Sequence, residues 1–477
     1  MKKPLLLLVC SFLICPVFVH AQKKIEGHWG KKFMDVAYSA AAANDGGYIL
    51  TGLTQSGSDT TGDIVVIKLS AQGDTQWTFT YGGPKLEGGN NVIQTADGGY
   101  LVSGHTEDFG AQDCDAFLMK MDKNGNRDWL KVYGGEKDDI GEGVIELPGG
   151  GYIFAGITAS WGNTDNSERR HVYFVRTNAG GDVLWTKYYA GKDVEYGYSI
   201  APVYDGGFLA VGYSSSWGHG ETDGWILRLN ASGDTLWTRL YQNNGDSKFY
   251  KILPTADNGF IVAGYTTQGN NSKPQGLVIK LDADGNKLWE KLYGTTNQGI
   301  LLRDAAQLPD GNLMFTGVSY TADTTGNAYV LTTDVVGVRI AEMLCGGGYS
   351  ASNCIAVQGN NSYLVAGISP KYGDSYGDIY YMEIDNTVSN VPTIDQGSAH
   401  VYPNPVKDQL CIILPSPEAY QPVNIDITNM KGQVVLSKEN LMAKDIVIDR
   451  SVFPNGPYVF SILCRDGKVY KGKFIVN

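Results

Sequence analysis

The stretch LDADGNKLWEKLYG (residues 281–294) occurs in five variants along this 477-residue chain. In every copy a turn glycine is followed four residues later by a tryptophan and eight residues later by a tyrosine. The tryptophans are Trp77, Trp129, Trp185, Trp237 and Trp289, with spacings of 52, 56, 52 and 52 residues. A nearly constant period of this length indicates a repeat protein.

A second motif runs in phase with the tryptophans. Its first copy is DGGYILTG, and seven copies occupy residues 45–52, 97–104, 149–156, 205–212, 257–264, 310–317 and 360–367. Asp-Gly and Gly-Gly pairs favour tight hairpin turns, and apolar strand-like runs stand on both sides of each copy. Each unit therefore predicts four short strands, which is the content of one blade of a β-propeller. Seven units predict seven blades.

The strand count also predicts how the ring closes. The seventh unit ends after its third strand, at residues 378–385, so its fourth strand is missing. The segment KKIEGHWG (residues 23–30) stands one 52-residue period before the first tryptophan-bearing strand. We expect this segment to complete the seventh blade, because closure removes the unpaired strand edges of the ring.

The repeated tryptophans are expected on the outermost strands, each packed against the neighbouring blade. A buried ring covers ~150–250 Å². A set of ligand-binding tryptophans is the alternative. The motif resembles the tryptophan-docking motif of pyrroloquinoline-quinone-type propellers, although its turn is one residue shorter. The sequence has no adjacent cysteine pair of the kind those enzymes use at their cofactor. The resemblance therefore implies blade geometry and not redox chemistry, and we predict no cofactor.

A column of cations repeats five residues before each turn glycine: Lys68, Lys120, Arg176, Arg228 and Lys280. One interpretation is a ring of positive charge around a central channel. The other is one solvated or ion-paired side chain per blade, and we favour it because the third strand of a blade lies away from the axis.

The N-terminus predicts a signal peptide over residues 1–21. Lys2 and Lys3 precede an apolar run of 14 residues (5–18), which is too short to span a bilayer comfortably. Removing both lysines leaves 36 basic and 50 acidic residues, a net charge of −14. This balance argues against nucleic acid as a partner. No other segment is long and apolar enough to span a membrane.

The repeat stops after Asp385, and residues 386–400 form a polar linker. Residues 401–477 alternate apolar and polar residues between Gly and Asn turns, which predicts a small antiparallel β-sandwich. The predicted fold is thus all-β, a seven-bladed β-propeller (22–385) followed by a small C-terminal β-sandwich.

The C-terminal segment resembles the type A C-terminal sorting domain of type IX secretion system cargo. The matching positions are Tyr402, Pro403, Asn404, Pro405, Gly432, Gly456, Tyr458 and Lys473. The resemblance implies recognition by the type IX translocon through residues 401–477, passage through the periplasm, and release from the cell or attachment to its outer surface.

Catalytic and metal-binding motifs are not evident. No histidine pair, G-x-S-x-G elbow or zinc spacing occurs, so we predict no metal site. The acidic turns that begin at Asp122 and Asp282 have their glycine at the fourth position, where a calcium loop would have it at the sixth. We interpret them as ordinary turns.

Loop aromatics are the remaining candidates. The loops between the second and third strands vary most between blades and carry aromatic residues beside acidic ones. The predicted ligand-binding residues are Trp161, Trp217, Phe109, Tyr372, Tyr376, Asp165 and Asp223. Trp161 and Trp217 could equally fold back onto their own blades. The predicted function is a secreted or surface-attached module that binds a glycan or a protein. The alternatives are an extracellular polysaccharide hydrolase or lyase with its site at the channel mouth, and a structural surface protein.

Overall fold

The computed structural model describes residues 22–30, 33–55, 61–109, 113–163, 169–217, 222–241, 245–267, 273–295, 297–320, 326–346, 349–359, 362–370, 377–385, 400–402, 405–406, 408–413, 423–429, 434–441, 445–464 and 469–476. The signal segment 1–21 and linker residues 386–399 lie outside this set. The chain divides into two compact units, residues 1–387 and residues 388–477.

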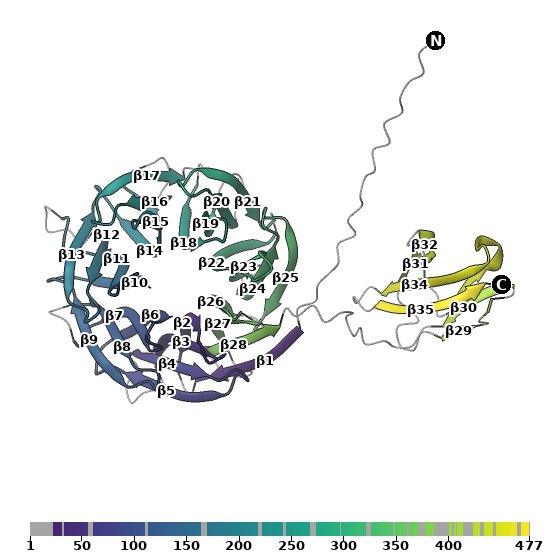
Figure 1. Cartoon of the computed structure of the whole chain (residues 1–477), viewed down its shortest axis with the longest axis horizontal. Helices are drawn as coiled ribbons and strands as arrows, with labels where there is room; N and C mark the ends of the chain where they lie inside the picture. Colours follow the sequence, from purple (N-terminus) through teal and green to yellow (C-terminus); the bar gives the residue numbers. More distant parts are fainter. Residues whose placement is uncertain are drawn as a thin grey trace, which may run out of the picture. The chain divides into compact units, whose positions relative to one another are not determined.

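The first unit is a ring of seven four-stranded antiparallel sheets, confirming the predicted propeller (Figure 1). Each sheet is one blade, and its strands follow one another from the axis of the ring outward. The first four blades are β2 (Asp35–Ala42), β3 (Tyr48–Thr54), β4 (Asp63–Leu69), β5 (Thr75–Tyr81); β6 (Glu87–Gln94), β7 (Tyr100–Thr106), β8 (Asp115–Met121), β9 (Arg127–Tyr133); β10 (Asp139–Glu146), β11 (Tyr152–Thr158), β12 (His171–Thr177), β13 (Val183–Tyr189); and β14 (Glu195–Pro202), β15 (Phe208–Ser214), β16 (Asp223–Leu229), β17 (Thr235–Tyr241).

The remaining blades follow the same order. They are β18 (Ser247–Pro254), β19 (Phe260–Thr266), β20 (Gln275–Leu281), β21 (Lys287–Tyr293); β22 (Gly299–Gln307), β23 (Leu313–Tyr320), β24 (Gly326–Thr333), β25 (Arg339–Cys345); and β26 (Ala351–Val357), β27 (Ser362–Pro370), β28 (Gly377–Asp385) with β1 (Gln22–Trp29). The second and third strands of the blades are almost entirely buried, whereas β5 alternates exposed and half-buried residues. The apolar runs therefore form the interior of each blade.

The N-terminal strand closes the ring. Strand β1 pairs antiparallel with β28, with Glu26 opposite Met382 and Trp29 opposite Ile379. The seventh sheet has the order β1-β28-β27-β26, so the first strand of the chain takes the outermost position of the last blade. The predicted closure is confirmed.

Each repeated tryptophan packs against the next blade, as predicted. A Cβ added at Gly181 in the third blade would lie 2.8 Å from the indole of Trp129 in the second. Gly233, Gly285 and Gly337 face Trp185, Trp237 and Trp289 in the same way. The five indoles are half-buried rather than buried, because they lie on the outermost strands and keep one side in solvent.

The cation column forms ion pairs inside single blades. Lys68 contacts Asp45 at 2.8 Å, and Lys120 contacts Asp97 at 2.9 Å. Arg228 pairs with Asp205, and Lys280 pairs with Asp257. The carboxylates belong to the Asp-Gly turns, so these cations hold the turns to the third strands and form no axial ring. In the third blade, glycine replaces this aspartate at position 149, opposite Arg176.

All seven innermost strands share one irregularity. In every blade, the register between the first and second strands shifts at the same level. The shift follows directly after the pair that contains a glycine of the second strand; these glycines are Gly52, Gly104, Gly156, Gly212, Gly264, Gly317 and Gly367. The residues in these bulges are Tyr38, Asn90, Glu142 with Gly143, Tyr198, Tyr250, Arg303 and Asn353. A bulge re-aims a side chain and often lies next to a functional site. We call this set the bulge ring.

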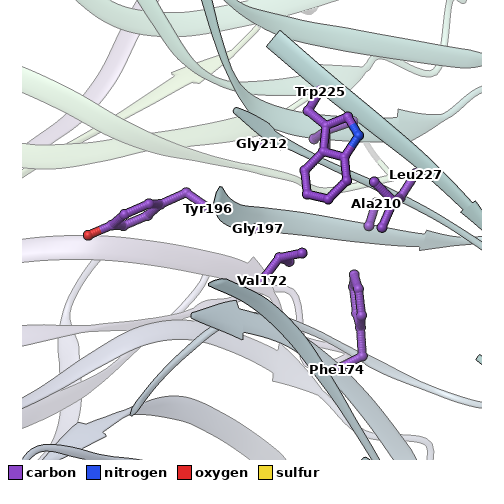
Figure 2. Close-up of a pocket in the computed structure, with 9 residues that line it drawn as sticks. Val172, Phe174, Tyr196, Gly197, Ala210, Gly212, Trp225 and Leu227 are labelled. Atoms are coloured by element: carbon purple, nitrogen blue, oxygen red, sulfur yellow. The ribbon is translucent and has the colours of Figure 1, made fainter. Parts of the chain in front are cut away.

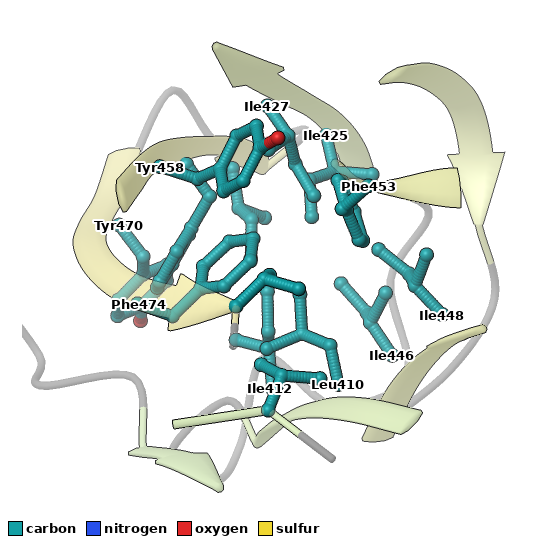
Figure 3. Packing of buried hydrophobic residues seen from close by; sticks show 14 of the residues in the cluster. Leu410, Ile412, Ile425, Ile427, Ile446, Ile448, Phe453, Tyr458, Tyr470 and Phe474 are labelled. Carbon is teal, nitrogen blue, oxygen red and sulfur yellow. The ribbon is translucent and has the colours of Figure 1, made fainter. Parts of the chain in front are cut away.

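The second unit is the predicted β-sandwich. One sheet has the order β29-β30-β33 and the other β32-β31-β34-β35. The strands are β29 (His400–Tyr402), β30 (Gln409–Ile413), β31 (Val423–Asn429), β32 (Val434–Leu441), β33 (Asp445–Asp449), β34 (Gly456–Cys464) and β35 (Val469–Val476), with a short 3-10 helix η2 (Arg450–Val452) after β33. Buried isoleucines and aromatic rings from both sheets meet in one core (Figure 3).

Candidate functional site

A groove of about 520 Å³ lies beside Trp217, between the third and fourth blades. Its walls come from the end of β13, from β16 and β17, and from the loop after β15; the lining residues are Tyr188, Tyr189, Ala190, Trp217, Trp225, Leu227, Thr235, Thr238 and Leu240. Trp217 is 42% exposed and Tyr188 48% exposed. The volume falls within the range of small-ligand sites, and the lining is aromatic and apolar with a few hydroxyl groups.

Trp217 is held in place by a second indole. The ring centroids of Trp217 and Trp225 are 5.4 Å apart, tilted by 54°. Trp225 is buried, and its Nε1 donates to Thr238 Oγ1. Trp225 therefore supports the Trp217 ring from one side, while Trp217 as a whole stays 42% exposed.

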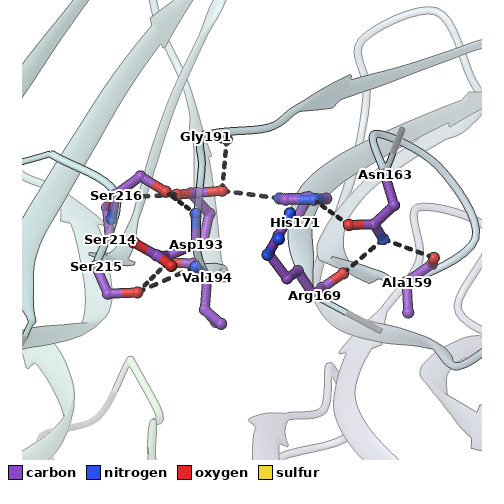
Figure 4. A network of polar contacts seen from close by, with 11 residues as sticks. Ala159, Asn163, Arg169, His171, Gly191, Asp193, Val194, Ser214, Ser215 and Ser216 are labelled. Carbon is purple, nitrogen blue, oxygen red and sulfur yellow. Dashed lines mark hydrogen bonds and ion pairs between the residues drawn. The ribbon is translucent and has the colours of Figure 1, made fainter. Parts of the chain in front are cut away.

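Trp161 folds back instead. Its ring centroid lies 6.1 Å from that of Tyr173 in the same blade, and it packs against a buried apolar cluster. The loop that carries it is fixed by Asn163, whose Nδ2 donates to the carbonyls of Ala159 and Arg169 at 3.1 and 3.0 Å (Figure 4). Packing explains this tryptophan better than ligand binding.

A buried polar network joins that loop to the next blade. His171 Nδ1 lies 2.9 Å from Glu195 Oε2, and His171 Nε2 lies 3.1 Å from Asn163 Oδ1 (Figure 4). Ser214 and Ser216 donate to the Glu195 carboxylate, not to the imidazole. In a Ser-His-acid triad the serine would face the histidine. The arrangement therefore orders two loops and does not build a nucleophile.

The other predicted ligand-binding residues are not among the residues that line the groove beside Trp217. Phe109 is 38% exposed and stacks on Tyr81 with centroids 5.1 Å apart. Asp223 begins β16 and is buried, with only 2% of its surface exposed, so it does not face a ligand in solution as we predicted. Asp165, Tyr372 and Tyr376 lie outside the described residues.

Paired carboxylates occur at the blade junctions, but they are buried. Asp115 and Asp139, from adjacent blades, both crowd against Gly134 and are 2% and 0% exposed. Burial raises the pKa of Asp139 to about 6. Burial also raises the pKa of Glu87 to about 7, with a further contribution from the Asp108 and Asp63 carboxylates. Burial therefore disfavours the ionised forms of these acids in the folded protein, and their carboxyl groups do not face a substrate in solution.

The acidic turns behave as ordinary turns. Asp122 Oδ1 accepts hydrogen bonds from the backbone N–H groups of Asn124 and Asn126, at 2.8 and 2.9 Å. Asp282 does the same with Asp284 and Asn286. Within the described residues, no three or more His, Cys, Asp or Glu side chains are grouped so that they could hold a metal ion.

An aromatic surface near the axis of the ring was not predicted from the sequence. Tyr196, Tyr198, Tyr213, Tyr250 and Tyr265 form a connected set of rings on the first and second strands of the fourth and fifth blades, with centroids 4.9–6.1 Å apart. We call it the tyrosine belt. Figure 2 shows the Tyr196 ring pointing away from the apolar side chains of Val172, Phe174 and Trp225. The pocket between those side chains measures only about 10 Å³, so it is a packing gap.

The sequence signal that could have revealed the tyrosine belt is asymmetry within the repeat. The pair equivalent to Tyr196 and Tyr213 is Val36 and Leu53 in the first blade and Ile140 and Ile157 in the third. Tyrosines at these positions in only two neighbouring blades depart from the pattern of the repeat. Such a departure is more informative about function than the repeat itself.

The sorting-domain residues are placed as follows. Tyr402 pairs with Cys411 in the smaller sheet, and Gly456 begins β34 with a φ of +146°. Tyr458 is buried against Phe453 and Phe474, and its hydroxyl donates to the Pro454 carbonyl at 2.7 Å. Pro405 and Lys473 are exposed, whereas Pro403, Asn404 and Gly432 lie outside the described residues.

Comparisons with known proteins bear on both units. The family model described as "Secretion system C-terminal sorting domain" matches residues 400–477. A stretch of 94 residues is 30% identical to ulvan lyase NLR42 of Nonlabens ulvanivorans, covering 20% of this chain and 17% of that protein. This chain therefore covers less than a fifth of that protein's length.

Two solved structures are similar to this chain at low identity and low TM-score. One is described as the extracellular domain of a one component system from B. thetaiotaomicron: 9% identity, TM-score 0.41, covering 94% of this chain and 59% of that chain. Another is a puromycin hydrolase mutant: 14% identity, TM-score 0.48, covering 81% of this chain and 62% of that chain. This chain thus spans less than two thirds of each of these relatives.

Export is the property that these observations establish. Within the described residues no helix is long and apolar enough to cross a membrane. The sorting domain has its own core and its own sheets, as an independently folding signal requires. Residues 400–477 are therefore a C-terminal sorting domain of the type IX secretion system, and the protein that ends in them is secreted or attached to the outer cell surface.

Proposed function

We propose that the propeller is a glycan-binding module that works outside the cell, and that the glycan binds in the groove beside Trp217. The observation that carries the proposal is that Trp217 is exposed and lines a groove of about 520 Å³. Aromatic rings with nearby hydroxyl groups suit a sugar, which presents an apolar ring face and a polar edge.

Binding is favoured over catalysis by the chemistry of the lining. A glycosidase needs two carboxyl groups within reach of one glycosidic bond. Among the described residues, those that line the groove are tyrosine, tryptophan, leucine, alanine and threonine, and none of these carries a carboxylate. The paired acids at the blade junctions are buried, as Asp115 and Asp139 illustrate.

The test is a glycan array with the purified propeller, followed by calorimetric titration of the glycans that bind. Trp217→Ala should weaken binding at least about tenfold, since stacking contributes about 0.5–1.5 kcal/mol beyond the buried area. Trp161→Ala is the matched control, because Trp161 packs inside its own blade. Equal affinities for wild type and Trp217→Ala, with the fold intact, would remove the groove as the site.

The domain limits belong to the same proposal. We place the signal peptide at residues 1–21, the exported propeller at 22–385 and the linker at 386–399, because His400 already belongs to β29. Strand β1 begins at Gln22, so cleavage before Gln22 would leave the closing strand complete. Mass spectrometry of the exported protein should therefore give Gln22 as the first residue, and an N-terminus inside β1 would contradict the assignment.

A further inference from the structure

The bulge ring contains one cation, Arg303, whose charge is not neutralised by an ion pair in the described part of the chain. Arg303 lies in the bulge of β22 and is exposed. Its Nη1 donates to Asn353 Oδ1 at 2.6 Å, and Asn353 Nδ2 donates to the Ala37 carbonyl at 2.8 Å. This chain of contacts crosses three blades and fixes the guanidinium at the axial side of the innermost strands.

No carboxylate in the described part of the chain forms an ion pair with Arg303. Its sequence neighbour Asp304 is already occupied: Oδ1 contacts Lys251 Nζ at 2.8 Å, and Oδ2 accepts from the Ile355 amide at 2.9 Å. Four of the five cations in the column on the third strands are paired with turn aspartates: Lys68, Lys120, Arg228 and Lys280. Arg303 thus differs from these paired cations, which hold the turns of their own blades to the third strands.

The groups that face Arg303 around the axis are neutral near pH 7. Tyr38 and Tyr250 both interact electrostatically with the guanidinium, and burial raises the pKa of each phenol, so both stay protonated. Burial raises the pKa of Glu142, in the bulge of the third blade, to about 8. The bulge ring therefore presents one positive charge, Arg303, among hydroxyl and amide groups and one carboxyl group, Glu142, that is mostly protonated near pH 7.

Aromatic rings continue from this charge into the tyrosine belt. Tyr250 belongs to both the bulge ring and the belt, and its ring centroid lies 4.9 Å from that of Tyr198. Lys248 lies over the Tyr213 ring, with its Nζ 4.2 Å from the centroid. A ligand that reaches Arg303 would thus have ring faces and phenol hydroxyls beside it.

We propose that the axial surface formed by Arg303, Tyr38, Tyr250, Asn353 and the tyrosine belt binds an oxyanion carried by a saccharide, either a carboxylate or a sulfate group. A guanidinium binds both groups with two parallel N–H···O bonds, and its fork is fixed here by Asn353. The phenols donate further hydrogen bonds, and the tyrosine rings pack on the sugar. This site is separate from the Trp217 groove and does not depend on it.

The experiment is calorimetric titration of the purified propeller with three oligosaccharides of one length: oligogalacturonate, the same oligomer with methyl-esterified carboxyls, and a sulfated oligogalactose. We expect the oligogalacturonate or the sulfated oligogalactose to bind. The esterified oligomer should bind at least about tenfold more weakly, because a hydrogen bond to a charged group is stronger than one to a neutral group. The tighter of the two acidic probes identifies the group. Failure of both acidic probes to bind at about 1 mM would overturn the proposal.

Variants then locate the site. Arg303→Gln should weaken acidic binding about tenfold or more, and Arg303→Lys less, because lysine keeps the charge but loses the fork. Arg239→Gln is the matched control, since Arg239 lies on an outermost strand over the Trp237 ring. Equal losses in Arg239→Gln and Arg303→Gln, or no loss in Arg303→Gln, would overturn the assignment.

Two further variants cover other outcomes. If Arg303→Gln fails to fold, Tyr38→Phe, which removes only the phenol hydroxyl, should still weaken binding of the acidic probe about threefold. An unchanged affinity would count against the site. Trp217→Ala should leave acidic binding unchanged. That result separates this site from the groove, and loss of acidic binding in Trp217→Ala would assign the oxyanion to the groove instead.

Discussion

Trp77 of the first blade lies against Gly125 of the second, where an added Cβ would be 3.0–3.1 Å from three carbon atoms of the indole. Gly125 also has a φ of +87°, in the left-handed region. One glycine therefore serves two purposes: it closes the turn before β9, and it leaves room for the tryptophan of the neighbouring blade. The same contact at successive junctions links the blades around the ring.

Gly125→Ala tests this contact, and Gly98→Ala is its control. Gly98 has nearly the same φ, +83°, but an added Cβ there would meet nothing within 4 Å. Gly98→Ala should lower the free energy of unfolding by about 1–2 kcal/mol through backbone strain alone. Gly125→Ala should cost at least about 1 kcal/mol more, because it also crowds the indole. Denaturant unfolding measures both, and equal costs would show that the junction absorbs the methyl group.

Deletion of residues 23–29 tests closure of the ring. Strand β1 supplies the outermost partner of β28, and without it that edge and its apolar contacts are exposed. The melting temperature should fall by about 10 °C or more, since each kcal/mol shifts a large domain by about 2–4 °C. Amide exchange should also increase across β28.

Glu26→Ala is the control for that deletion. Glu26 is exposed and pairs through its backbone with Met382, so its truncation keeps the strand. Its melting temperature should stay near that of the wild type. A deletion variant as stable as Glu26→Ala would mean that the ring holds without β1.

Glu87 should make the stability of the propeller fall as pH rises. Its pKa in the folded protein is about 7, above the ordinary value near 4.3 that it takes when unfolded. Between these values the folded state binds more protons than the unfolded state, so the free energy of unfolding decreases with pH and levels off above pH 7. The decrease attributable to Glu87 should be about 1–3 kcal/mol.

Glu87→Gln should remove that part of the pH dependence, because glutamine keeps the shape but does not titrate. Glu136→Gln, at an exposed position of the loop before β10, should leave the dependence as it is. Denaturant unfolding at pH 4.5, 6 and 8 provides the comparison. A parallel pH profile in wild type and Glu87→Gln would show that Glu87 does not titrate in this window.

The candidate sites were only partly predictable. Trp161 and Trp217 occupy similar loops and look equivalent in the sequence, yet one packs on Tyr173 and the other opens onto a groove. The difference depends on which side chains of other strands surround each loop. Asp223 was expected in a loop, but the strand extends to include it and buries its carboxylate.

The blade count, the order of strands, the closing strand and the sorting domain can all be predicted from the sequence. These features follow from local patterns: a period of about 52 residues, Asp-Gly turns, alternating apolar residues and short motifs. The axial surface shared by Arg303, Tyr38 and Asn353 cannot be predicted in this way, because these residues are distant in the chain and lie on three blades. They meet because the ring closes and each innermost strand has a bulge at the same level, and no local pattern encodes a distance across the ring.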